Sequence, residues 1–250
     1  MIVRDDPGAG DGAWLAIGQP AHAWVSGQAA RAWGNAAFAA PEPWEEVCLA
    51  AEQHDIGMAA WDLAPALNPR TGRAFAFAEM PRPVHVELWS HAAERLLAQS
   101  RYAALLVSLH GTTLYERYPA TTHLELVEAY LDGQRALQVD LRASLRAEPA
   151  EVERNRELLF FWDWLSLALC LGWAPAESPE LPGAGRLRLA PAGDETLTLD
   201  PWPFARPEVR LQTEGRRLPG PFTSEAELNA ALASAPWTAL EWRLVTPSGD

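Results

Sequence analysis

The feature that most constrains the fold is a series of apolar patterns at helical spacing, which continues from Gln19 to Gly172. Apolar residues that recur every three or four positions share one face of a helix. Residues such as Pro149, at a first turn, and Gly57, after a last turn, divide the series into separate helices. Helices are expected at residues 19–38, 44–54, 84–98, 102–115, 122–146 and 149–171. Five or six consecutive helices predict an all-α core.

Shorter alternating patterns lie at the two ends of the chain. Residues 1–4 and 13–18 predict two strands around a turn-rich segment. A late helix is expected from Ser224, which can cap it. Further strands are expected at residues 186–191, 196–201, 208–212 and 239–247. We therefore expect a mainly α protein with a helical domain at 1–175 and a small C-terminal β-rich appendage at 176–250, which packs on it and can pair with the N-terminal strands.

The charge balance limits the partners. The 250 residues carry a formal net charge of −13, which argues against a nucleic-acid-binding surface because such surfaces need many basic contacts to phosphates. All 20 basic residues are arginines. An anion would therefore have to be held by arginine, by backbone N–H groups or by a bound metal. We expect a small, anionic substrate and no nucleic acid.

The sequence gives no sign of export or membrane insertion. The N-terminus lacks a basic region followed by an apolar run, and the longest apolar stretch, residues 158–173, is interrupted by Asp163 and short for a bilayer span. Cys48 and Cys170 lie in apolar helical contexts without metal-ligand spacing. Such cysteines are typical of buried free thiols in a reducing compartment, so a cytoplasmic location is expected.

Two polar residues lie on strongly apolar helix faces. Asp163 shares its face with Leu159 and Cys170, and His110 follows Leu106 by four positions. A buried carboxylate without a partner is costly or takes up a proton, so an arginine, backbone donors or a metal has to pair with it. A single histidine of this kind, taken alone, is more often a core residue with a hydrogen-bond partner.

Three more polar residues have the same character and favour a metal site. His22 points with the apolar side of the first helix, and His54 and Asp55 lie side by side at the end of the second. Imidazole nitrogen and carboxylate oxygen suit Zn²⁺, Mn²⁺, Fe²⁺, Ni²⁺ or Co²⁺, and a set without thiolates argues against a closed structural zinc site. Ligands from separate helices can leave positions open for water or substrate. We expect one or two divalent ions in a catalytic site.

His85 and His91 are two further candidate ligands on the expected third helix. Each groups with apolar neighbours such as Leu88, so helical geometry does not choose between them. One of the two is expected to face solvent or to support the ligands from outside. His123 stands among threonine and glutamate residues at a helix start and is expected at the surface.

With these positions in place, the chain resembles the HD superfamily of metal-dependent phosphohydrolases. The likeness lies in the order of an early His22, the adjacent pair His54-Asp55 within HDIG, intermediate histidines and a late Asp163, over about residues 19–172. The resemblance implies an HD-domain-like helical bundle in which these four residues hold a divalent metal. It further implies that the metal activates a water for attack on a phosphate ester.

The same resemblance implies a place for the intermediate histidines, His110 and a third-helix histidine, near the phosphate or a second metal. More narrowly, the segments HDIGMAAWD, LLVSLH and FWDWLSLALC resemble an uncharacterised bacterial family described as a domain of unknown function, over most of the chain. One departure concerns Met58, because many HDIG proteins have a lysine there that methionine cannot replace in holding a phosphate. The arginines that could substitute are Arg70, Arg73, Arg82 and Arg101.

Three functions follow as expectations. The first is a hydrolase of a small-molecule phosphate ester, with Asp55 as a metal ligand and His110 as a hydrogen-bonding group or proton donor. The second is an oxygenase, because some HD-fold proteins oxidise small organic substrates with two irons held by six such ligands. The third is a non-catalytic protein in which a metal or a buried polar network stabilises the bundle and the β appendage binds a partner.

Overall fold

The computed structural model describes residues 1–6, 8, 10, 12–193 and 196–247. Its α-helices are α1 (Gln19–Ala32), α2 (Trp44–Gln53), α3 (Ala59–Leu63), α4 (Arg82–Ser90), α5 (Arg101–Arg117), α6 (Leu124–Leu145), α7 (Pro149–Leu171) and α8 (Glu225–Ser234). Short 3₁₀ turns are η2 (Ile56–Met58), η3 (Phe77–Glu79) and η4 (Glu94–Leu96). The expected helices form near their predicted bounds, except that the first ends early at Ala32 and the third already ends at Ser90.

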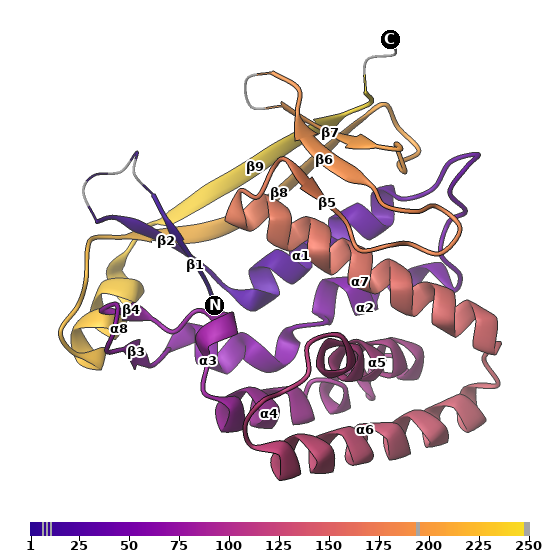
Figure 1. The fold of residues 1–250 in the computed structure, drawn as a ribbon, viewed down its shortest axis with the longest axis horizontal. Coiled ribbons are helices and arrows are strands. Elements are labelled where there is room, and N and C mark those ends of the chain that lie inside the picture. The colour runs from indigo at the N-terminus through magenta and orange to yellow at the C-terminus, as the bar shows by residue number, and fades with distance from the viewer. Residues whose placement is uncertain (7, 9, 11, 194–195, 248–250) are drawn as a thin grey trace.

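Helices α1, α2, α5 and α7 pack together and enclose the main core (Figure 1). Trp33 at the end of α1 meets Phe161 and Trp162 of α7 edge to face, with ring centroids 5.2 and 5.7 Å apart. From Leu158 to Cys170, helix α7 is mostly apolar and buried, because this part runs through the core. It ends at Gly172, whose φ of 70° is a left-handed conformation that glycine adopts without a steric cost.

The strands come from both ends of the chain. They are β1 (Ile2–Asp5), β2 (Trp14–Ile17), β3 (Leu67–Asn68), β4 (Arg73–Ala74), β5 (Ala176–Glu177), β6 (Arg188–Pro191), β7 (Thr196–Asp200), β8 (Glu208–Leu218) and β9 (Trp237–Val245). Strands β3 and β4 form a separate hairpin. Within the described residues, the other seven form one mixed sheet in the order β1-β2-β8-β9-β7-β6-β5, with β7 and β9 parallel.

This sheet corrects the expected fold class. A mainly α, all-α bundle with a small β appendage is wrong, because a large mixed sheet forms one side of the molecule (Figure 1). Strand β8 continues to Leu218, well past the short pattern that predicted it, and it pairs with β9 from Glu208↔Val245 to Arg216↔Trp237. Its other edge pairs with β2 through Trp14↔Leu218. Local periodicity detects strands one at a time and cannot show that distant segments combine into one sheet.

Helix α1 lies against the sheet and is held there by hydrogen bonds to β8. Gln28 Nε2 donates to the Gln212 carbonyl at 2.7 Å, and the Gln212 N–H donates back to Gln28 Oε1 at 3.0 Å. Thr213 Oγ1 donates to the carbonyl of Ala21 at 2.7 Å. The sheet therefore fixes the helix that carries His22.

In the described part of the chain, none of the helices is both long and apolar enough to cross a membrane. Cys48 and Cys170 are both buried and free. Burial raises the pKa of Cys48 to about 11 and that of Cys170 to about 12, so both are held as neutral thiols at pH 7.

Candidate metal centre

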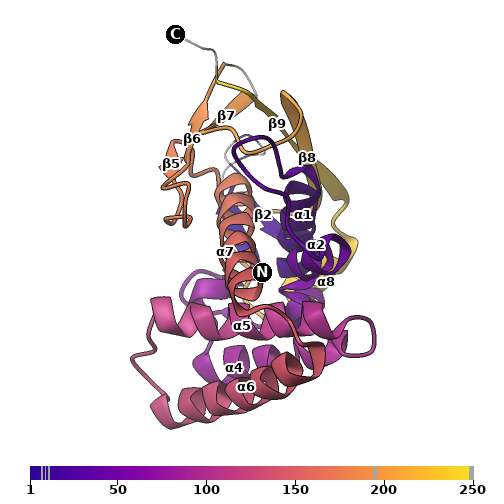
Figure 2. The same ribbon diagram turned by 90° about the vertical axis from the view of Figure 1, so that its right-hand side faces the viewer.

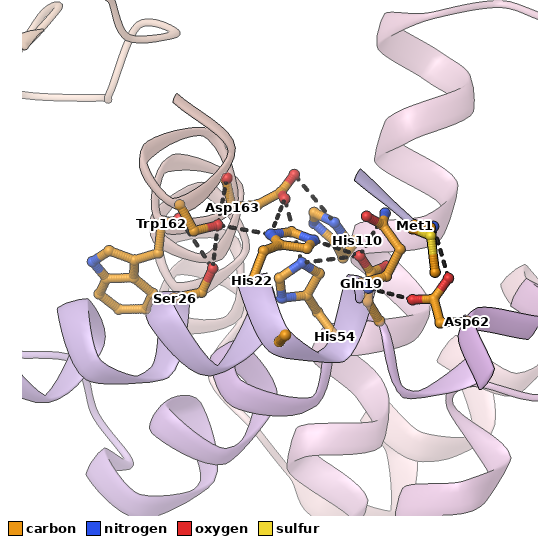
Figure 3. A network of polar contacts seen from close by, with 12 residues as sticks. Met1, Gln19, His22, Ser26, His54, Asp62, His110, Trp162 and Asp163 are labelled. Atoms are coloured by element: carbon orange, nitrogen blue, oxygen red, sulfur yellow. Dashed lines mark hydrogen bonds and ion pairs between the residues drawn. The ribbon is translucent and has the colours of Figure 1, made fainter. Parts of the chain in front are cut away.

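Five of the candidate residues meet at the crossing of four helical segments (Figure 3). They are His22 of α1, His54 and Asp55 after α2, His110 of α5 and Asp163 of α7. All five are buried. Buried imidazoles and carboxylates need partners, and here they have one another.

His22 is held in one orientation by a serine. Its Nδ1 lies 2.8 Å from Ser166 Oγ, and that hydroxyl donates its own proton to the Asp163 carbonyl at 2.8 Å. The oxygen therefore accepts a hydrogen bond from Nδ1–H of His22. The other ring nitrogen, Nε2, is hydrogen-bonded to Asp55 Oδ2 at 2.6 Å. This is the arrangement of a metal-binding histidine whose second nitrogen is fixed by a neighbour.

His54 has the same arrangement. Its Nδ1 donates to the Ala51 carbonyl one turn back, at 2.9 Å. Its Nε2 lies 3.3 Å from Asp163 Oδ1 and 3.7 Å from Asp55 Oδ2, yet it is buried without a hydrogen bond among the described residues. A nitrogen lone pair that faces two carboxylates requires a proton or a cation between them.

The cluster can hold a metal ion. One ligand atom each from His22, His54 and Asp163 lies within 4.8 Å of the others, and all three residues are buried. Two nitrogens and one carboxylate oxygen are a donor set of the kind that catalytic zinc and other divalent metals use. Asp55 adds a second carboxylate at the same point. The orphaned Nε2 of His54 and the chemistry of this donor set therefore fit a divalent cation.

The charges within the cluster oppose the cost of burial. Burial lowers the pKa of His54, but the carboxylates of Asp55 and Asp163 outweigh it and raise the value to about 9. Burial also raises the pKa of Asp55 and Asp163, but the neighbouring histidines more than offset it and hold both values below the ordinary range. Both carboxylates are therefore ionised at pH 7 and attract a cation.

His110 lies at the edge of the cluster, next to Asp163 and His54. Its Nε2 is 3.6 Å from Asp163 Oδ2, and its ring centroid is 4.9 Å from that of His54 and 5.7 Å from that of Trp89. Its Nδ1 is buried without a hydrogen bond in the described part of the structure. Burial lowers the pKa of His110 to about 4, and Asp163 only partly opposes this. His110 is therefore a neutral imidazole at pH 7.

Several supporting residues escaped sequence reasoning. Gln19 Nε2 donates to Asp55 Oδ2 at 3.1 Å, and the Gln19 backbone N–H donates to the Asp62 carboxylate (Figure 3). Ser26 Oγ donates to Ser166 Oγ at 2.9 Å. The signal was present in the spacing, because Ser26 follows His22 by four positions and Ser166 follows Asp163 by three, which puts each hydroxyl on the same helix face as a ligand.

Gly57 in the HDIG segment has a packing role. A Cβ at this position would lie 2.4 Å from the Leu88 carbonyl oxygen of α4 and 3.2 Å from the Ala92 side chain. Only glycine lets the η2 turn approach α4 so closely. Helix α2 has already ended at Gln53, so Gly57 acts by close contact and is not its terminator. The following Met58 is buried in the core.

The two third-helix candidates lie in different places. His85 is half-buried, with its Nδ1 2.8 Å from the Tyr115 hydroxyl and its ring centroid 6.1 Å from that of Trp89. His91 follows the end of α4, is 61% exposed, and contacts Glu94 at 3.4 Å. His85 is therefore next to Trp89, which also contacts His110 of the cluster, whereas the structure places His91 at the surface. His123 is also exposed.

The four candidate arginines also differ. Arg70 pairs with Glu79 at 3.0 Å, and Arg73 pairs with Asp5 at 2.6 Å. Arg101 is exposed at the start of α5. The guanidinium of Arg82 lies 5.5 Å from the ring centroid of Tyr115, the partner of His85. Of the four, Arg82 is connected to His85 through Tyr115, which both side chains contact.

The chain was compared with protein families, curated proteins and solved structures. A family model described as a protein of unknown function, DUF3891, matches residues 1–220. No curated protein and no solved structure matches the chain. The match confirms the narrower of the two resemblances in the sequence. The chain belongs to the DUF3891 family.

Proposed function

We propose that this protein is a metal-dependent hydrolase that acts on the phosphate ester of a small molecule. The observation that carries the proposal is the orientation of His22 and His54. Each donates its Nδ1 proton to a neighbouring oxygen, and Nε2 faces Asp55 in His22 and both Asp55 and Asp163 in His54. The kinship proposed with the HD superfamily rests on this residue set and not on the overall fold.

The proposed ligands are His22, His54, Asp55 and Asp163, which would hold one or two divalent ions of Mn, Fe, Ni, Co or Zn. When bound, such an ion lowers the pKa of a coordinated water and offsets charge that develops on a phosphoryl oxygen. The carboxylate of Asp55 is oriented for this role by Gln19 Nε2 at 3.1 Å. The Ser166 hydroxyl keeps His22 in the tautomer that presents Nε2.

His110 is proposed as the group that hydrogen-bonds the substrate. It is neutral at pH 7, and its Nε2 lies 3.6 Å from Asp163 Oδ2 at the edge of the ligand set. A neutral imidazole carries one N–H, which can donate to an oxygen of the ester or pass a proton to the leaving group. Because Nδ1 has no hydrogen bond among the described residues, either ring nitrogen of His110 can carry the proton.

Arg82 is proposed to attract the anionic part of the substrate. The lysine of many HDIG segments is replaced by the buried Met58, so the positive charge has to come from elsewhere. Arg82 is half-buried and has no carboxylate partner among the described residues. It stacks on Tyr115, which also contacts His85. A planar guanidinium held in this way can bind phosphate oxygens in pairs.

Elemental analysis tests the metal, and a panel of phosphoesters tests the reaction. The purified protein is loaded in turn with Mn²⁺, Fe²⁺, Ni²⁺ and Co²⁺, and it is expected to retain about one or two ions and to hydrolyse at least one ester. His54→Gln and Asp163→Asn are expected to lose both properties. His91→Gln is the matched control and is expected to keep both, since its side chain is at the surface.

Other outcomes separate the alternatives. Retained iron together with oxygen uptake and no phosphoester hydrolysis would favour the di-iron oxygenase. The observation in favour of an oxygenase is that five possible ligands lie in contact and that His85 lies nearby. Retained metal with neither reaction would favour a non-catalytic role in which the ion stabilises the helices. Circular dichroism of each variant shows that a loss is not caused by unfolding.

A further inference from the structure

A large cleft lies between the sheet and the C-terminal part of α7, away from the ligand set. Its volume is about 1080 Å³, and it is lined by residues of the strands β6, β7, β8 and β9, of the helices α1 and α7, and of the N-terminal strand β1. In Figure 2 the strands arch over the upper end of α7. A cleft of this size is at the upper end of the range for small-molecule sites.

Among the residues that the structure describes, the lining of the cleft is basic although the protein is strongly acidic. Arg4, Arg210 and Arg243 line it, and Glu241 is the carboxylate residue in its lining. Arg210 and Arg243 share one carboxylate, that of Glu208, at 3.0 and 2.7 Å, so the three described arginines exceed Glu208 and Glu241 by one positive charge. Arg4 has no ion pair among the described residues. These arginines give the cleft a charge opposite to the −13 of the whole chain.

A second cavity of about 610 Å³ adjoins the cleft and extends the basic surface. The two share Gln28 and Arg210 as lining residues. The lining of the second cavity also includes Arg31 and Arg206. Arg31 pairs with Glu52 at 2.6 Å. Both cavities are built on the same stretch of β8 where α1 is attached.

The cleft also has apolar walls. Leu197 and Trp242 are half-buried there, and Leu169, Leu189 and Leu211 form the floor beneath them. Polar and apolar surface thus meet in one concavity. A ligand that fits has both an anionic group and an apolar body.

We propose that this cleft binds a small amphipathic anion, with a carboxylate or phosphate group paired to arginine and an apolar body against Trp242 and Leu197. The net charge of the chain opposes a polyanion such as nucleic acid, whereas a small anion meets only the local positive charge. Arg4 gains most from such a ligand, because its guanidinium has no ion pair to break among the residues that the structure describes. This binding site is distinct from the proposed hydrolase site.

Isothermal titration calorimetry tests the proposal on the 250-residue protein, with and without added divalent metal. The probes are octanoate, octyl phosphate and octanol, which share an eight-carbon chain and differ in the head group. Saturable binding of one or both anions and no binding of octanol is expected, and the comparison of the two anions identifies the preferred head group. Arg4→Gln is expected to weaken anion binding by about tenfold or more, as loss of a charge-assisted contact does.

Arg101→Gln is the matched control, because Arg101 is also an arginine without an ion pair among the described residues, but it is exposed on α5. It is expected to bind the anions as the unchanged protein does. The proposal is overturned if neither anion binds, if octanol binds equally well, or if Arg4→Gln and Arg101→Gln behave alike. Metal content is measured in both variants and is expected to be unchanged, so the result does not depend on the hydrolase proposal.

Discussion

The ligand set between the helices and the cleft under the sheet are opposite kinds of polar site. In the first, buried carboxylates and imidazoles face one another and leave no side chain open to bulk water. In the second, arginines line an open cleft with apolar walls. Burial, more than residue type, therefore decides what a substitution does. A change between the helices should affect folding and cation binding together, whereas a change in the cleft should affect anion binding alone.

The largest effect is expected from Asp163→Ala. It removes the carboxylate that faces His54 Nε2 and leaves a cationic imidazole buried with half of its compensation. Loss of one partner from a buried ion pair costs about 3–5 kcal/mol. Urea unfolding of the metal-free protein measures this loss. Equal stabilities of Asp163→Ala and the unchanged protein would show that the cluster is not electrostatically coupled.

The next largest loss of stability is expected from Gly57→Ala. The added Cβ meets the Leu88 carbonyl oxygen at 2.4 Å, so α4 or the η2 turn has to move. Overpacking of this kind costs about 1–3 kcal/mol. Gly133→Ala is the control, since a Cβ there meets nothing within 4 Å. Thermal unfolding of both variants measures the difference, and an equal or higher melting temperature for Gly57→Ala would contradict the contact.

Ser166→Ala is expected to lower the metal affinity without abolishing metal binding. The hydroxyl that fixes the His22 tautomer is lost, while His22 itself stays. Removal of such a supporting hydrogen bond lowers metal affinity by about 10- to 100-fold. Competition with a chelator measures the affinity. Ser144→Ala serves as control, because Ser144 donates to the Leu141 carbonyl of its own helix, and it is expected to leave the affinity unchanged.

The pH dependence follows from His54. Its pKa in the folded protein is raised to about 9, above its ordinary value of 6.5. The bound proton therefore stabilises the metal-free fold fully below pH 6.5, and this contribution is lost as the pH rises through about 9. A metal has to displace that proton, so affinity should rise by about tenfold per pH unit between these values. An affinity that is constant over this interval would contradict the assignment.

The smallest effect on stability is expected in the cleft. Arg4→Gln removes a partly exposed guanidinium without an ion pair among the described residues, so the free energy of unfolding should change by about 0.5 kcal/mol or less. Chemical denaturation measures it alongside Asp163→Ala. A loss as large as that of Asp163→Ala would remove the contrast between the two sites.

The sequence predicted the helices well and the sheet poorly, for a physical reason. Residues such as His22, His110 and Asp163 stand out because a polar group on an apolar helix face is visible within a few turns of chain. Strand pairing is not local, since β2 and β8 come from opposite ends of the chain. The size of the sheet therefore depends on contacts that periodicity does not contain.

The cluster itself was only partly predictable. The resemblance named His22, His54, Asp55 and Asp163 as a set, and the structure brings these four side chains together. It could not separate His85 from His91, because the helix ends before His91 and the end point is a matter of tertiary packing. The cleft was missed altogether, because Arg4 of β1 and Arg243 of β9 come from opposite ends of the chain and belong to one sheet only in the folded protein.

We propose above that the Nε2 atoms of His22 and His54 hold a divalent metal. The most direct test is the metal content of the purified protein by plasma mass spectrometry, before and after loading with Mn²⁺, Fe²⁺, Ni²⁺, Co²⁺ and Zn²⁺. We expect about one or two ions per chain, lost in His54→Gln and retained in His91→Gln. A folded, unchanged protein that retains no ion under any loading condition would contradict the claim.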